Sequence, residues 1–95
     1  MEINNILILS SLTKFNTANY LISSFKRYVN KVFVYSDVNS INADLYGKGF
    51  VSLRKILNQT PFYPELIFFI EGGTMQLFPY DLENVKCLTA WYGID

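Results

Sequence analysis

The chain has 95 residues, of which 51% are apolar and 17% aromatic, and eight basic side chains balance eight acidic ones. This length and composition predict one globular domain and argue against a disordered chain. The zero net charge gives no electrostatic reason to expect nucleic acid as a partner. The chain contains no histidine, so a zinc site or a Ser-His-Asp triad is excluded or nearly so, and we expect neither a bound metal nor a cofactor.

The single cysteine, Cys87, cannot form a disulfide within the chain, which favours a reducing compartment. Because it lies in an apolar run, we expect a buried structural thiol rather than a nucleophile. The N-terminus lacks the positive region of a signal peptide, and no apolar run approaches the ~20 residues of a membrane span. The sequence therefore predicts a cytoplasmic protein with no membrane span.

The first part of the chain predicts a strand, a helix and a second strand. Residues 6–9 form a continuous apolar run, which is typical of a strand buried on both faces. Apolar residues then recur at helical spacing over 18–29, with Leu21 and Phe25 expected to be buried, and Asn16 or Thr17 can cap the helix. A short apolar run at 32–35 predicts the second strand.

The second part of the chain predicts loops, a helix and two more strands. Residues 38–50 are weakly patterned and contain several Asn and Gly residues, so we expect turns there. A helix should begin at Ser52 and end before Pro61, since the residue before a proline disfavours helical geometry. The apolar runs at 66–70 and 88–92 predict the third and fourth strands.

This alternation of strands and helices predicts an α/β fold in which residues 1–95 form one domain. We expect a Rossmann-like, three-layer α/β/α domain with a four-stranded parallel sheet. Numbered along the chain, the strands should lie in the order 2-1-3-4. The runs at 6–9 and 66–70 are the most continuously apolar, so they should be central.

Polar residues and glycines follow the predicted strands, where open α/β sheets bind ligands. Hydroxyls there can contact a sugar or phosphate, glycine allows a close approach, and two carboxylates can act as acid and base or bind hydroxyls. The candidate cleft-lining residues are Ser10, Ser11, Glu71, Gly72, Gly73 and Asp95. The same pattern can also be explained without a ligand, by a tight turn at the glycines and by carboxylates exposed to solvent. The glycine fingerprints of dinucleotide and phosphate loops are missing.

Two segments carry a family resemblance: 65–73, Glu-Leu-Ile-Phe-Phe-Ile-Glu-Gly-Gly, and 87–95, Cys-Leu-Thr-Ala-Trp-Tyr-Gly-Ile-Asp. They resemble the N-terminal half of bacterial glycosyltransferases related to the spore-maturation protein CgeB. The match covers roughly the last thirty residues, and the rest matches only by the order of elements. Glu65 stands where the family usually has aspartate, and the Thr-His pair that usually follows would lie beyond Asp95.

The resemblance implies a transferase of the GT-B type, with two Rossmann-like domains facing across a cleft and no need for a bound metal. In such enzymes the C-terminal domain binds the nucleotide-sugar donor, and the N-terminal domain shapes the acceptor side. This chain would then be the acceptor-side domain, inactive alone, with a sugar acceptor and a nucleotide-sugar donor as partners. The family carries over Glu71, Gly72, Gly73 and Asp95 as cleft-lining positions and identifies no catalytic residue.

The alternative is a stand-alone flavodoxin- or receiver-like module that binds a partner or small ligand. A receiver needs paired acidic residues after its first strand, where this chain has serines. A flavodoxin needs a phosphate loop, to which Ser10, Ser11 and Thr13 show only a weak similarity. A second α/β domain in the natural protein would favour the transferase. Exposed edge strands could also pair two copies into a homodimer.

Overall fold

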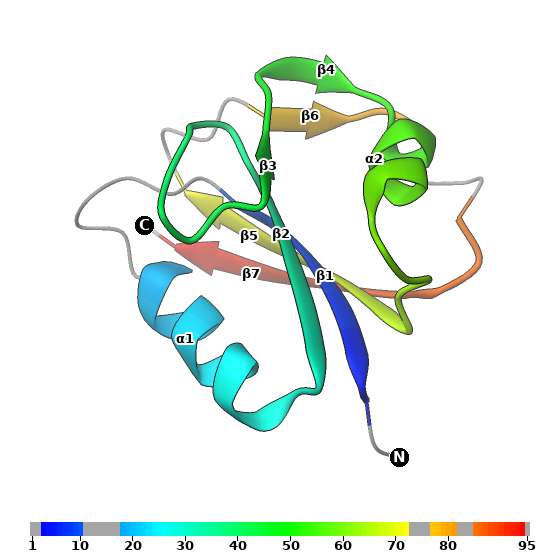
Figure 1. The fold of residues 1–95 in the computed structure, drawn as a ribbon. Coiled ribbons are helices and arrows are strands. Elements are labelled where there is room, and N and C mark those ends of the chain that lie inside the picture. Colours follow the sequence, from blue (N-terminus) through cyan, green and yellow to red (C-terminus); the bar gives the residue numbers. More distant parts are fainter. Residues whose placement is uncertain (1–2, 11–17, 73–76, 82–84, 95) are drawn as a thin grey trace.

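The computed structural model describes residues 3–10, 18–72, 77–81 and 85–94, and it shows a mixed α/β fold (Figure 1). Its elements in chain order are β1 (Asn5–Ser10), α1 (Ala18–Tyr28), β2 (Lys31–Ser36), β3 (Leu45–Tyr46), β4 (Gly49–Val51), α2 (Leu53–Gln59), β5 (Leu66–Gly72), β6 (Leu77–Pro79) and β7 (Leu88–Ile94). The main sheet has the order β3-β2-β1-β5-β7, and β4 and β6 form a separate two-stranded sheet.

Strand β1 lies at the centre of the main sheet. It pairs in parallel with β2 on one side and with β5 on the other. The four residues from Ile6 to Leu9 are fully buried, because neighbouring strands cover both edges and side chains cover both faces. The prediction of a strand buried on both faces at 6–9 is confirmed, and so is the central position of the strand at 66–70.

The prediction of a four-stranded sheet is wrong in its number of strands. The four predicted strands correspond to β2, β1, β5 and β7, which are neighbours in that order and all parallel. A fifth strand, β3, lies outside β2, so the order 2-1-3-4 describes only part of the sheet. The sequence did not reveal β3 because it has only two residues in a segment rich in Asn and Gly.

Hydrogen bonds on both flanks hold the short strand β3 against β2. The Asp44 N–H donates to the Val34 carbonyl oxygen (2.9 Å), and the Asp44 carboxylate accepts the Val34 N–H (2.8 Å). After the strand, the Gly47 N–H donates to the Ser36 carbonyl oxygen (2.9 Å). An aspartate side chain therefore completes the pairing that a two-residue strand cannot supply by itself.

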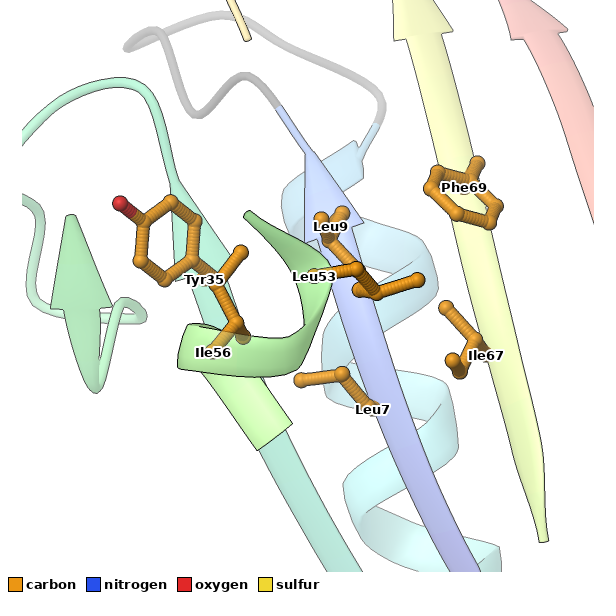
Figure 2. Packing of buried hydrophobic residues seen from close by; sticks show 7 residues of the cluster. All are labelled: Leu7, Leu9, Tyr35, Leu53, Ile56, Ile67 and Phe69. Carbon is orange, nitrogen blue, oxygen red and sulfur yellow. The ribbon is translucent and has the colours of Figure 1, made fainter. Parts of the chain in front are cut away.

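The two helices cover opposite faces of the main sheet (Figure 1). Successive side chains of a strand point to opposite faces. Leu7 and Leu9 accordingly belong to the cluster that includes Leu53 and Ile56 of α2, as Figure 2 shows. The alternate residues of β1, with Val34 and Ile70, instead pack with Ile22 of α1. The arrangement has three layers, helix, sheet and helix.

Helix α1 forms where the apolar periodicity predicts it, but its anchor differs from the expected one. Ile22 is fully buried, whereas Leu21 and Phe25 are only half-buried and pack against the same cluster. Phe25 meets Phe68 of β5 edge to face, with ring centroids 5.0 Å apart. The expected caps, Asn16 and Thr17, lie outside the described residues.

Helix α2 begins and ends where the sequence predicts. The Ser52 hydroxyl accepts the Lys55 N–H (3.3 Å), and the helix ends at Gln59, before Pro61. A carboxylate far along the chain adds to this cap: Asp81 accepts the N–H of Leu53 (2.5 Å) and of Arg54 (3.2 Å). It also accepts the Ser52 hydroxyl at 2.9 Å. A seven-residue helix is marginal alone, so these bonds and the burial of its apolar side stabilise it.

The small sheet of β4 and β6 was not expected from the sequence. Its strands run parallel, with Gly49 opposite Leu77 and Val51 opposite Pro79. Val51 packs against the cluster beneath α2, so this sheet extends the cover on that face. Three-residue strands in a loop-like composition carry too few side chains to show a period.

We predict that Gly47→Ala destabilises the fold through a clash with Tyr35. A Cβ at residue 47 would overlap the Tyr35 hydroxyl and lie 3.3 Å from its Cζ, and the ring is only 8% exposed. We expect a loss of about 1–3 kcal/mol in the free energy of unfolding, measured by urea denaturation. Tyr35→Phe removes the oxygen, so Gly47→Ala should be less costly in that background. Equal losses in both backgrounds would contradict the clash.

We predict that the cap from Asp81 weakens in acid. Desolvation raises the pKa of Asp81, but hydrogen bonds from the Leu53 and Arg54 N–H groups and the Ser52 hydroxyl lower it more, so it lies below the usual 3.8. The stabilisation is therefore complete well above pH 3.8 and is lost as the pH falls through the folded-state pKa. At pH 7, Asp81→Ala should lower the free energy of unfolding by about 1 kcal/mol, since water screens this carboxylate.

Urea denaturation of wild type and Asp81→Ala between pH 7 and pH 2.5 measures this effect. The difference between the two proteins should be constant near neutral pH and should shrink below about pH 4. Asp81→Asn, which keeps a carbonyl acceptor but cannot titrate, is the matched control. Its difference from Asp81→Ala should not change over that pH range. If the difference in free energy of unfolding between wild type and Asp81→Ala does not change with pH, a titrating cap is ruled out.

Candidate functional site

The strands of the main sheet end together at one edge, because they all run parallel. In register, Ser10 at the end of β1 lies opposite Ser36 at the end of β2 and opposite Ile70 of β5. Beyond Ile70, β5 continues through Glu71 and Gly72, which lie opposite Gly93 and Ile94 of β7. We call this end of the sheet the carboxyl edge.

The carboxyl edge contains the topological switch point of the sheet. Numbered by chain order, its five strands read 3-2-1-4-5, and the direction of winding reverses between β1 and β5. Open α/β sheets bind ligands in the crevice outside the strand ends at such a point. Of the residues predicted from the sequence, Ser10, Glu71 and Gly72 belong to the two strands that flank it. Ser11, Gly73 and Asp95 lie outside the described residues.

Ser10 is fully buried, so it lies beneath the surface of the carboxyl edge and is not open to solvent. Ser36, its neighbour in β2, is equally buried. The Ser36 hydroxyl accepts the Val38 N–H (3.2 Å) and donates to the Asp37 carboxylate at 3.5 Å. This hydroxyl therefore fixes the first turn after β2 and holds the start of the loop that follows.

Asp37 is a candidate site residue that was not predicted from the sequence. It follows β2 directly and is only 3% exposed, which is rare for a carboxylate. Burying a charge is costly unless hydrogen bonds compensate it, so its position is tightly specified. The Ser36-Asp37 pair was visible as the end of the second apolar run, and its resemblance to Ser10-Ser11 was the available signal.

A pocket of about 350 Å³ opens next to Asp37, between the carboxyl ends of β2 and β3. Its lining residues are Asp37, Val38, Asn39, Tyr46, Gly47 and Lys48. We call it the β2–β3 pocket. It combines a carboxylate, a side-chain amide and an ammonium group with the ring of Tyr46, which is 59% exposed. The sequence could not predict this pocket because one wall depends on β3.

A larger pocket of about 460 Å³ lies at the opposite end of the sheet. It is lined by residues at the start of β2 and after α2, including Lys31, Phe33, Asp44 and Phe62. Asp44 already pairs with the Val34 N–H in the β2–β3 contact. Because ligands of such sheets bind at the carboxyl ends of strands, the β2–β3 pocket is the better candidate despite its smaller volume.

Neither metal chemistry nor a reactive thiol is indicated among the described residues. No three of their His, Cys, Asp or Glu side chains are grouped so that they could hold a metal ion. Cys87 is half-buried and packs against the cluster beneath α2, and burial raises the pKa of its thiol. A raised pKa reduces the thiolate fraction, which agrees with the expected structural role.

Comparison with known proteins does not assign the chain to a family. No protein-family model, no curated protein and no solved structure matches the chain significantly. In the described part of the chain, neither helix is long and apolar enough to cross a membrane.

We predict that Cys87 reacts slowly with a thiol reagent in the folded protein. Partial burial limits access, and the raised pKa keeps the thiol protonated at neutral pH. The labelling rate, followed with a chromogenic disulfide at pH 7.5, should be severalfold lower than in the urea-unfolded chain. Cys87→Ser, which has no thiol, gives the background. Equal rates in the folded and unfolded chain would contradict the structural role.

Proposed function

We propose that this chain is the acceptor-side domain of a GT-B glycosyltransferase and binds a sugar acceptor at the carboxyl edge. One observation carries the proposal: a parallel sheet of order 3-2-1-4-5 with helices on both faces. This is the strand order of Rossmann-like domains, and the resemblance implies that GT-B enzymes are built from two of them. The cytoplasm, favoured by the lone cysteine, is the compartment we expect for such an enzyme.

The family resemblance and the fold support each other at two neighbouring strands. The segments 65–73 and 87–95, which resemble CgeB-related glycosyltransferases, include β5 and β7. These strands pair over seven positions, which brings Glu71 opposite Gly93 at the carboxyl edge. Positions carried over from the family thus lie beside the switch point, where a ligand of this fold is expected.

A sugar acceptor fits this domain better than the nucleotide donor. A diphosphate needs a glycine-rich turn that leads its oxygens to backbone N–H groups at a helix N-terminus. Between Ser10 and α1 the sequence contains no glycine, and the whole chain has no net positive charge. The carboxyl edge instead contains hydroxyl-bearing and carboxylate side chains, which bind neutral hydroxyls.

The flavodoxin- and receiver-like alternative is less well supported by the strand order. That class has the order 2-1-3-4-5, in which strand 2 forms an edge. Here β3 lies outside β2, and the order is 3-2-1-4-5. The choice between the two classes therefore depends on β3, which has only two residues.

One feature favours partner binding as a second function. Strand β7 is an edge strand of seven residues without a charged side chain, and it exposes Leu88, Trp91 and Tyr92. Each of these side chains is about half exposed, at 55%, 51% and 45%. Uncharged edges of this length invite pairing with another strand. A second domain or a second copy of the chain could occupy this edge.

Titration of the isotope-labelled chain, followed by amide NMR, tests the proposed function. We expect a panel of mono- and oligosaccharides to shift amide signals at the carboxyl edge, with dissociation constants of about a millimolar for single sugars. UDP-, GDP- and TDP-sugars should bind no tighter than the matching free sugar. The chain alone should transfer no sugar from any of these donors.

The controls separate specific binding from solvent effects. A straight-chain polyol at the same concentration should leave the spectrum unchanged, because it presents hydroxyls without a ring. Micromolar binding of any nucleotide-sugar would mean that the donor site lies in this domain, and the acceptor-side assignment would be wrong. Failure of every sugar to shift signals at the carboxyl edge would overturn the proposed function.

A further inference from the structure

The β2–β3 pocket lies on the carboxyl edge, beside the strands that flank the switch point. Ser36 at the end of β2 is in register with Ser10 of β1 on one side and Tyr46 of β3 on the other. The pocket is thus continuous with the strand ends where a ligand of this fold is expected. Its volume of about 350 Å³ falls at the lower end of the range for small-molecule sites.

The polar wall of the pocket is built around a carboxylate held in place. Asp37 is 3% exposed, and Ser36, whose hydroxyl donates to it, has no exposed surface. A carboxylate can accept about four hydrogen bonds, so protein donors and two ligand hydroxyls can share it. Hydrogen bonds to a charged acceptor are about twice as strong as neutral ones, which suits a ligand rich in hydroxyls.

The lining of the pocket also includes an aromatic side chain. Tyr46 lines the pocket and has more than half of its surface open to solvent. An exposed tyrosine ring is a flat apolar surface against which the C–H face of a sugar ring can pack. Gly47, next in the chain, lines the same pocket, and its N–H is bonded to the Ser36 carbonyl oxygen, which fixes the position of this wall.

The two charged residues of the pocket have opposite signs, which suits a neutral ligand. Asp37 carries a negative charge and Lys48 a positive one, and both line the same space. With one charge of each sign, the lining favours neither a cation nor a phosphate by net charge. The amide of Asn39 adds one donor group and one acceptor for further hydroxyls.

We propose that the β2–β3 pocket binds a vicinal pair of hydroxyls on a sugar ring, with Asp37 accepting both and Tyr46 packing against the ring face. This inference deepens the proposed function and rests on it only for the sugar being an acceptor. The hydroxyls can belong to a free sugar or to the ribose of a nucleoside. The chemistry recognised at the pocket is the same in both cases.

Paired ligands that differ by one hydroxyl test the recognition of the diol. Methyl α-mannopyranoside and its 3-deoxy analogue, whose ring carries no vicinal pair of hydroxyls, form one pair, and uridine and 2′-deoxyuridine form the other, each titrated into the full chain by amide NMR. We expect the diol of the sugar pair to bind at least about tenfold tighter than its deoxy analogue, with shifts at Asp37, Asn39 and Lys48. Equal affinities within both pairs would overturn the proposal.

Variants of the two walls identify the residues that bind. Asp37→Asn should weaken the binding of the diol about tenfold or more and should remove most of the preference over the deoxy analogue. Because Asp37 is buried, signal dispersion in the variant's amide spectrum must show that it is folded. Tyr46 is exposed, so Tyr46→Ala tests the pocket without that risk, and it should weaken binding of the sugar about tenfold.

Tyr63→Ala is the matched control, since Tyr63 is 62% exposed, close to the value for Tyr46, and lines a different pocket. It should leave the affinity unchanged, and equal effects of the two substitutions would overturn the proposal. Binding of uridine without any free sugar would support the diol pocket and refute the acceptor-side function. If a free sugar shifts the amide signals of Glu71 and Gly72 but not those of the β2–β3 pocket, the acceptor-side function is supported and the diol pocket is refuted.

Discussion

The structure depends on one constraint: β1 is enclosed on all sides. Its backbone groups pair with β2 and β5, and the side chains from Ile6 to Leu9 are entirely buried. Since side chains alternate, the strand divides its apolar residues between the cluster under α2 and the cluster under α1. A shift of one residue in register would exchange the two sets, so the packing of both helices fixes the same alignment.

This alignment also determines the geometry of the candidate site. With β1 fixed between β2 and β5, Ser10, Ser36 and Ile70 lie side by side at the ends of their strands. Asp37, one residue beyond β2, is then buried at the mouth of the pocket. The site is therefore a property of strand register, supported by a rigid core, and the loops add walls to it.

The elements that could be predicted are those with enough residues to show a pattern. The runs of β1, β2, β5 and β7 and the cap at Ser52 are local signals, and the structure confirms them. The short strands β3, β4 and β6 have two or three residues each, so their pairing depends on groups distant in sequence. The β2–β3 pocket could not be predicted for the same reason, because Tyr46 becomes a wall only when β3 forms. Asp37 was visible in the sequence, but its burial was not.

Three of the described carboxylates, those of Asp44, Glu65 and Asp81, bond to main-chain N–H groups of another segment. Asp44 accepts the Val34 N–H, and Asp81 accepts two N–H groups at the start of α2. Glu65 accepts the N–H groups of Asn4 and Asn5 at 2.9 and 3.2 Å. Each of these carboxylates joins two segments by completing a main-chain donor, which explains an acidic residue there without any ligand. Asp37 also has a protein partner, the Ser36 hydroxyl, but in addition it lines a pocket at the carboxyl edge, where open α/β sheets bind their ligands.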